Sequence, residues 1–213
     1  MKQIDFGCAA WSEVAALQAE AVLQVQQGGE EVVFFGEHPP TVSLGRRSKP
    51  ISAPEETLLR ARGFALFNAN RGGATTIFSP GQAIVYPIVR LQGGVVAHVE
   101  RLAEAGRKVA AGVGVASRFL RQQPGLWTAT GKLASIGIRV ERRVSSHGLA
   151  LNVSNELTSF GLVEICATPG LRMTSLVNEL SRTQNESSVA KPWMARWVAQ
   201  RIAEALCESE VVA

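Results

Sequence analysis

The spacing of apolar residues along the 213-residue chain predicts a mixture of helices and strands. Apolar residues recur at helical spacing from Trp11 to Val25 and again over 95–111, which predicts two long amphipathic helices. Short apolar runs bounded by Gly or Pro predict strands, and they lie at 31–35, 41–44, 64–67, 82–91, 133–140 and 144–153. Because helices and strands do not alternate regularly, we expect an α+β fold in a single domain, with a mixed, mostly antiparallel sheet and flanking helices.

One polar segment, 181–189, is the only boundary that the pattern suggests. We therefore assign residues 1–190 to the main domain and 191–213 to a C-terminal helix that packs on this domain or trails from it. The apolar positions Trp193, Trp197 and Ile202 support that helix.

Four residues depart from their local pattern. Gln18 is the one polar residue on the apolar stripe of the first helix. Pro87 lies inside a strand and predicts a sheet edge or a bulge. His98 has charged neighbours and is expected to be solvated, whereas His38 precedes two prolines and is expected to brace a turn.

Composition narrows the class of protein. The net charge is +4 and the basic residues are scattered, which argues against a nucleic-acid partner. No apolar run is long enough to span a bilayer and no signal sequence is visible, so we expect a cytoplasmic protein without a membrane partner. Three cysteines without C-x-x-C spacing and three scattered histidines argue against a disulfide framework and against a metal site.

Two neighbouring strands each carry one face of small or polar residues. Ser135, Gly137 and Arg139 share a face of one strand, and Gly148, Ala150 and Asn152 share a face of the next. These faces could form a groove for a slender chain, or they could accommodate a crossing helix. The pattern leaves both interpretations open.

Two residues near this pair of strands could carry chemistry. If the strand extends back to Lys132, the ammonium points to the apolar side, and burial favours the neutral amine, which is a proton acceptor. The alternative, a solvated turn residue, is favoured by position alone. Cys166 lies where a strand end meets a turn, and a nearby cation could activate its thiol. Taken alone, Cys166 is more simply a small buried hydrophobic residue.

A series of motifs over nearly the whole chain resembles the lipoyl(octanoyl) transferase family. The first motifs are Glu37-His38-Pro39-Pro40-Thr41 with Leu44-Gly45-Arg46, Arg71-Gly72-Gly73 with Thr76, Pro80-Gly81-Gln82, and Tyr86-Pro87-Ile88. They continue with Gly125-Leu126-Trp127, Lys132-Leu133-Ala134-Ser135-Ile136-Gly137, His147-Gly148-Leu149-Ala150, and Cys166 followed by Gly170 and Thr174-Ser175-Leu176.

The resemblance implies the fold shared with lipoate and biotin ligases and a two-step acyl transfer. Octanoyl, or lipoyl, would pass from acyl carrier protein through a cysteine thioester to a lysine of lipoyl domains, in 2-oxoacid dehydrogenases or the glycine cleavage H protein. It implies that Cys166 is the nucleophile and Lys132 its proton partner, with no ATP, metal or other cofactor. The implied substrate-binding residues are Arg71, Gly72, Gly73, Ala74, Thr75, Thr76, Ile77, Phe78, Ser135, Ile136, Gly137, His147, Gly148, Leu149 and Ala150.

Two motifs differ from the family pattern. Ile77-Phe78-Ser79 stands where Tyr-His-Gly is usual, and Ile165-Cys166-Ala167 stands where Pro-Cys-Gly is usual. The first change removes a phenol and an imidazole, so we expect an altered acyl or donor preference or weaker activity. The alternatives to the octanoyltransferase are an amidotransferase between lipoyl-domain proteins and a non-catalytic protein that binds lipoyl domains or acyl chains.

Overall fold

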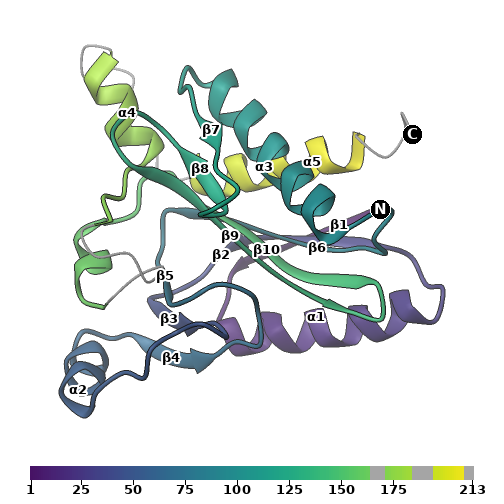
Figure 1. Ribbon diagram of the computed structural model, residues 1–213, viewed down its shortest axis with the longest axis horizontal. Coiled ribbons are helices and arrows are strands. Elements are labelled where there is room, and N and C mark those ends of the chain that lie inside the picture. The colour runs from purple at the N-terminus through teal and green to yellow at the C-terminus, as the bar shows by residue number, and fades with distance from the viewer. Residues whose placement is uncertain (164–170, 184–193, 209–213) are drawn as a thin grey trace.

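The structure is a computed structural model that describes residues 1–163, 171–183 and 194–208 (Figure 1). Its strands are β1 (Lys2–Cys8), β2 (Val32–Glu37), β3 (Thr41–Leu44), β4 (Ala65–Asn68), β5 (Thr76–Phe78), β6 (Gln82–Ile88), β7 (Arg118–Phe119), β8 (Gly125–Trp127), β9 (Lys132–Glu141) and β10 (Val144–Asn152). Its helices are α1 (Trp11–Gln26), α2 (Ala53–Ala61), α3 (Val95–Gly112), the short 3₁₀ helix η1 (Thr158–Gly161), α4 (Leu176–Thr183) and α5 (Met194–Glu208).

The larger sheet has the strand order β1-β2-β6-β10-β9-β8-β7. Its first two strands pair in parallel and the other neighbours pair antiparallel. The mixed, mostly antiparallel sheet expected from the sequence is thereby confirmed. A smaller sheet, β4-β3-β5, lies beside it with α2.

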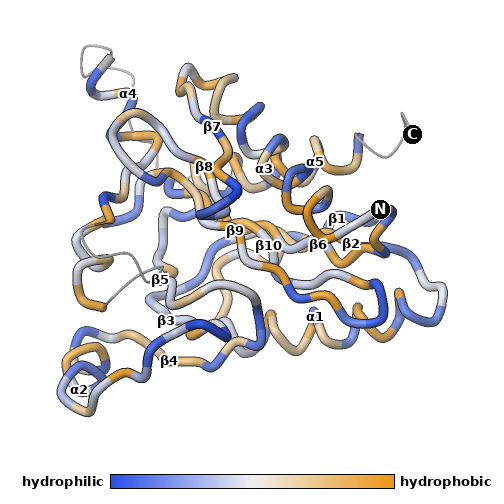
Figure 2. The backbone as a smooth tube through the Cα atoms, in the orientation of Figure 1, coloured by the Kyte–Doolittle hydropathy of each residue, from blue (hydrophilic) through white to orange (hydrophobic). Residues whose placement is uncertain are grey.

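Helices cover both faces of the larger sheet (Figure 1). Val33, Val85 and Leu149 belong to a buried cluster that also contains residues of α3 and α5. Their strand neighbours Phe34 and Ile84 point to the other face and pack with α1. This alternation follows from the two-residue period of a strand, and hydrophobic residues are accordingly concentrated along the central strands in Figure 2.

Pro87 lies in the interior of the sheet, so the predicted edge position is wrong. The β6–β10 ladder runs from Val85–Leu149 to Gln82–Asn152 and does not include Pro87. Proline has no N–H to donate, and the Pro87 carbonyl instead accepts a hydrogen bond from Ser145 Oγ at 2.9 Å. The ladder between β6 and β10 therefore stops at Val85–Leu149, and the pairing resumes at the Arg90–Val144 bridge without a change in strand order.

The predicted solvation of His98 is also wrong, because its side chain is only 6% exposed. His98 shares the buried stripe of α3 with Leu102 and Gly106, at spacings of four residues. Burial lowers the pKa of His98 to about 4, with the charge of Arg101 as a smaller cause. Gly106 allows close packing, since a Cβ atom there would lie 3.0 Å from Leu126 Cδ1.

The C-terminal helix α5 packs on the sheet through a fully buried stripe that includes Val198, Ile202 and Leu206. The predicted boundary at residue 190 falls in 184–193, outside the described residues, and it stays a prediction. In the described part of the chain, no helix combines the length and the apolar character that crossing a membrane requires.

Candidate active site

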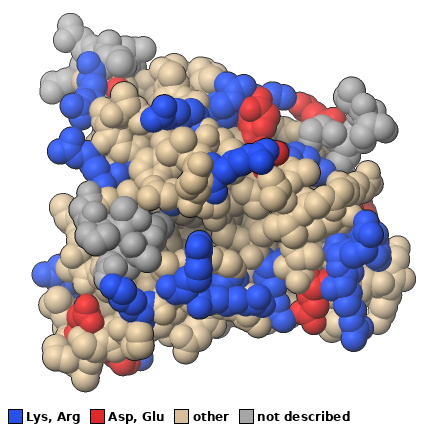
Figure 3. Space-filling view, viewed as in Figure 1, with Lys and Arg blue, Asp and Glu red and all other residues tan. Residues whose placement is uncertain are grey.

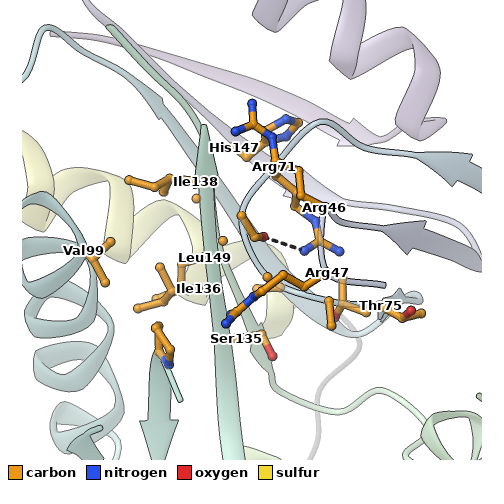
Figure 4. A pocket seen from close by; sticks show the side chains of 18 of the residues that line it. Arg46, Arg47, Arg71, Thr75, Val99, Ser135, Ile136, Ile138, His147 and Leu149 are labelled. Carbon is orange, nitrogen blue, oxygen red and sulfur yellow. Dashed lines mark hydrogen bonds between the residues drawn. The ribbon is translucent and has the colours of Figure 1, made fainter. Parts of the chain in front are cut away.

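A cavity of about 650 Å³ opens beside β9 and β10 (Figure 4). One wall is the loop 71–76 that leads into β5, and another is formed by the paired strands β9 and β10. Val95 and Val99 of α3 and the segment 122–124 also line the cavity. Figure 4 shows Val99 on the other side of β9 from Arg46 and Arg47.

Every predicted substrate-binding residue except Ile77 lines this cavity. Ile77 is fully buried in a separate cluster with Val42, Leu59 and Phe64, because alternate residues of β5 face opposite sides. Its neighbours Thr76 and Phe78 do line the cavity. The structure brings the other predicted residues together, and their role in binding stays a prediction.

The small residues of β9 and β10 face one another across the strand pair. Gly137 is opposite Gly148, and Ser135 is opposite Ala150. All four line the cavity, which agrees with the groove interpretation. Gly137 also makes room for the loop 71–76, because a Cβ atom there would lie 2.9 Å from the Gly72 carbonyl oxygen. A Cβ atom at Gly148 would lie 2.2 Å from the Val85 carbonyl oxygen, so only glycine fits there. We call the strip formed by these four residues the slot.

Arg71 fixes the loop that covers the slot. Its guanidinium donates hydrogen bonds to Ser43 Oγ, to the Ser43 carbonyl and to the Gly72 carbonyl, at 3.2, 2.8 and 3.0 Å. The Gly72 N–H in turn donates to the Ile138 carbonyl at 2.9 Å. The loop is therefore tied both to β3 and to β9.

Among the residues that the structure describes, the charged side chains that line the cavity are all basic: Arg46, Arg47, Arg71 and Lys132. Arg46 Nε donates to Asn70 Oδ1 at 2.7 Å. Figure 3 shows a cluster of Lys and Arg side chains near the middle of one face of the molecule. A cationic lining favours a ligand with a negatively polarised oxygen over one with a positive charge.

Lys132 opens β9 and its side chain is only 3% exposed, so the solvated turn residue is wrong. Its backbone N–H donates to the Arg172 carbonyl at 2.8 Å, and its carbonyl accepts from the Thr174 N–H at 3.0 Å. The ammonium lies 5.4 Å from the centre of the Trp127 ring, within the range of a cation–π contact.

Cys166 lies outside the described residues, and so does the predicted pairing of its thiol with Lys132. The structure describes the chain up to Val163 and again from Leu171. Val163 packs in a buried cluster with Phe160, and Arg172 is bound to the Lys132 backbone.

Two histidines near the cavity, the buried His38 and the half-buried His147, are held in their neutral forms. His38 Nδ1 donates to the Ala9 carbonyl at 2.7 Å, so it braces the connection between β1 and α1, and Nε2 accepts from the Tyr86 hydroxyl at 3.0 Å. Burial lowers the pKa of His38 to about 4. Burial also lowers the pKa of His147 to about 4, with the charges of Arg71 and Arg139 as further causes. Burial raises the pKa of Tyr86, so its phenol stays protonated.

Several lining residues were missed as binding residues from the sequence, including Trp11, Tyr86 and Val99. Tyr86 and Arg46 belong to motifs that resemble the family, but the residues around them in the sequence do not indicate that they face a cavity. For α1, the feature that could have indicated a role at the site is the polar residue Gln18 on its apolar stripe. This residue is 2% exposed, and its side-chain oxygen accepts the backbone N–H of His147 at 2.8 Å.

Residues 12–198 match the family model of the lipoyl protein ligase A/B catalytic domain. Two curated relatives are octanoyltransferases. That of Desulfovibrio desulfuricans is 36% identical over 183 residues, 84% of this chain and 77% of the relative. That of Geobacter sulfurreducens is 34% identical over 201 residues, 91% of this chain and 83% of the relative.

Solved structures agree with this fold at much lower sequence identity. Protein Ta0514 from T. acidophilum with bound lipoic acid has a TM-score of 0.73 at 13% identity, covering 99% of this chain and 86% of that one. Lipoate-protein ligase A bound with ATP has a TM-score of 0.69 at 14% identity, covering 97% and 86%. At this sequence identity, the two structural similarities support the fold and nothing further.

Proposed function

The chain belongs to the lipoyl protein ligase A/B catalytic domain family, and from this premise we propose that it is an octanoyltransferase of lipoate biosynthesis. The donor is octanoyl-acyl carrier protein and the acceptor is a lysine of a lipoyl domain. The observation that carries the proposal is a buried lysine, Lys132, at one end of a slot whose floor is stripped to small residues. Such a slot fits an unbranched alkyl chain, and a lysine at its end fits acyl chemistry.

The first step transfers the acyl group to the enzyme. The Cys166 sulfur attacks the donor thioester carbonyl while the Lys132 amine takes the thiol proton. The tetrahedral intermediate collapses, the carrier thiolate leaves, and Lys132 returns the proton to it. In the second step the acceptor lysine amine attacks the enzyme thioester, an amide forms, and the Cys166 sulfur leaves with the proton that the amine gives up.

The oxyanion of each tetrahedral intermediate needs a hydrogen-bond donor. In the turn 71–73, the Arg71 N–H donates to the Ala69 carbonyl and the Gly72 N–H donates to the Ile138 carbonyl. Within the described part of the chain, Gly73 is the member of this turn whose N–H makes no hydrogen bond. Gly73 is therefore our candidate from this turn, and the amides of 166–167 are the other candidates.

The free energy of the donor thioester drives both steps, so the proposal includes neither ATP nor a metal ion. The same residues would serve an amidotransferase that takes its acyl group from another lipoyl-domain protein. These two functions differ only in the donor that reacts.

Intact-mass analysis tests the thioester. The native protein is mixed with octanoyl-carrier, and we expect one octanoyl adduct that peptide mapping assigns to Cys166. Cys166→Ser should form no thioester, whereas Cys8→Ser and Cys207→Ser are matched controls that should react normally. Adding a lipoyl domain should then move the octanoyl group to its lysine.

Full turnover by Cys166→Ser would rule out the thioester route. Binding of octanoyl-carrier without any adduct or transfer would favour the non-catalytic binding protein. Reaction with an octanoylated lipoyl domain, but not with octanoyl-carrier, would favour the amidotransferase.

A further inference from the structure

A second cavity of about 400 Å³ lies directly beyond the first. It is bounded by one face of α1, by Asn68 and Asn70 at the end of β4, and by the outer half of the β9–β10 hairpin. Ala15, Gln18 and Val22 of α1 are part of its lining. Two residues, Trp11 and His147, line both cavities. The wall between the two spaces is therefore formed by these two side chains.

The wall consists of stacked rings. The rings of Trp11 and His147 are nearly parallel, at 8°, with centroids 6.2 Å apart. The row continues on both sides, because Phe67 stacks on Trp11 at 5.2 Å and Tyr86 meets His147 edge-on at 6.3 Å. A row of neutral rings presents an apolar surface to both cavities.

The backbone conformation of His147 and a hydrogen bond to Gln18 fix the position of the His147 ring in the wall. His147 has a backbone φ of 59°, a left-handed conformation that is uncommon for residues other than glycine. Its N–H is bound by Gln18 Oε1 at 2.8 Å. The buried Gln18 thus sets the direction in which the His147 ring leaves the strand.

The wall stands at the end of the slot that is remote from Lys132. Along the strand pair, Ser135–Ala150 is followed by Gly137–Gly148 and then by Ile138–His147. Figure 4 shows Ser135 and His147 at opposite ends of the labelled residues on their side of β9. Three strand residues separate these ends, which is about 10 Å, and an extended eight-carbon chain has roughly that length.

We propose that Trp11 and His147 form an end wall that limits the acyl chain to about eight carbons, and that a longer chain would enter the second cavity if the wall were opened. This inference rests on the proposed function, because it takes the slot to be the acyl site. It adds to that function a structural reason for the length of acyl chain that the slot accepts.

The experiment measures binding of saturated fatty acids of eight, ten, twelve and fourteen carbons by calorimetry, and transfer from the matching acyl-carriers by intact mass. Trp11→Leu should raise the ratio of twelve-carbon to eight-carbon binding by about tenfold or more, since each added methylene gains a buried contact. His147→Gly opens the wall from the strand side at a position whose φ suits glycine, and it should shift the ratio in the same direction.

Two further variants make the result specific. Ala15→Phe fills the second cavity, so added to Trp11→Leu it should restore the preference for eight carbons. Trp197→Leu removes a partly exposed tryptophan from α5, far along the chain from the wall, and should leave the profile unchanged.

An unchanged chain-length profile in folded Trp11→Leu and His147→Gly would overturn the end wall while leaving the proposed function intact. A shift that Ala15→Phe fails to reverse would overturn the role of the second cavity. Absence of any chain binding by the native protein would overturn the proposed function and the end wall together.

Discussion

The two ends of the main cavity differ in the functional groups that they present and in the way that these are held. At one end, Lys132 presents an amino group and its backbone is bound to Arg172 and Thr174. At the other end, Trp11, His147 and Tyr86 present rings that stay neutral because burial lowers the pKa of the histidine and raises that of the tyrosine. We therefore expect a ligand with a polar head and an alkyl tail to bind with its head toward Lys132.

The largest expected effect comes from the polar end. Lys132→Met should reduce acyl transfer by about 10²- to 10⁴-fold, the usual contribution of a positioned proton acceptor. Because methionine keeps a similar length of apolar side chain, binding of octanoate should persist. Transfer is followed by intact mass and binding by calorimetry. Lys108→Met, an exposed change on α3, is the matched control. Equal loss of binding and transfer would mean that Lys132 supports the slot rather than the reaction.

The second expected effect is a pH dependence of the free energy of unfolding. His38, His98 and His147 all have a pKa lowered to about 4 by burial, whereas histidine in an unfolded chain titrates near pH ~6.5. Between these values the unfolded chain binds more protons, so the free energy of unfolding should fall as pH is lowered from about 6.5 to about 4. The loss is at most about 3 kcal/mol for each histidine.

Chemical denaturation at a series of pH values measures this slope. His98→Leu should reduce the pH dependence of the free energy of unfolding by the contribution of one histidine. It should leave acyl transfer intact, since His98 does not line the cavity. A slope that is the same in native protein and His98→Leu would contradict the neutral, buried state of that side chain.

The third effect tests the loop that joins the two ends. Arg71→Met removes hydrogen bonds to both the hydroxyl and the carbonyl of Ser43 and should lower the free energy of unfolding by about 1–3 kcal/mol. Arg47→Met removes a charge from the same cavity lining without those bonds and should have little effect on stability. Urea unfolding compares the two variants. A smaller loss for Arg71→Met than for Arg47→Met would show that the loop is held in another way.

The smallest effect concerns the apolar end. Phe78 lines the cavity where the family usually has histidine, and its ring lies 5.3 Å from the His38 ring. Phe78→His places a polar ring in this wall, so octanoate binding should weaken by a few fold, about 1 kcal/mol. Phe78→Leu keeps the wall apolar and is the control. If Phe78→His changes neither binding nor donor preference, the departure from the family motif has no role in specificity.

Local patterns predicted the parts of the site that depend on one strand pair. Strand parity placed the small residues on one face, and the structure puts Gly137 opposite Gly148 on the cavity. Membership of the family confirms the resemblance inferred from the motifs. Position alone favoured a solvated turn for Lys132, which was wrong, because the start of a strand depends on partners such as Arg172 that are remote in sequence.

Other features could not be read from local patterns, because they depend on how distant segments meet. The interior position of Pro87 is possible because Ser145 supplies a side-chain hydroxyl to its carbonyl. The row of rings joins residues from α1, β4, β6 and β10. His98 looked exposed from its charged neighbours, whereas its place on the stripe of Leu102 decided its burial.

The bond between Gly72 and Ile138 has a consequence for solubility. β8 pairs with β9 as far as Ser135, and the Ile136 N–H donates to the Pro124 carbonyl, so the backbone of β9 beyond Ile136 lies at an open side of the sheet. Open strand borders recruit strands from other molecules and start aggregation. By occupying the Ile138 carbonyl, the loop at Gly72 blocks that recruitment, and the charged pair Arg139–Glu141 discourages it further along the same strand. The segment that covers the slot thereby also keeps neighbouring molecules apart.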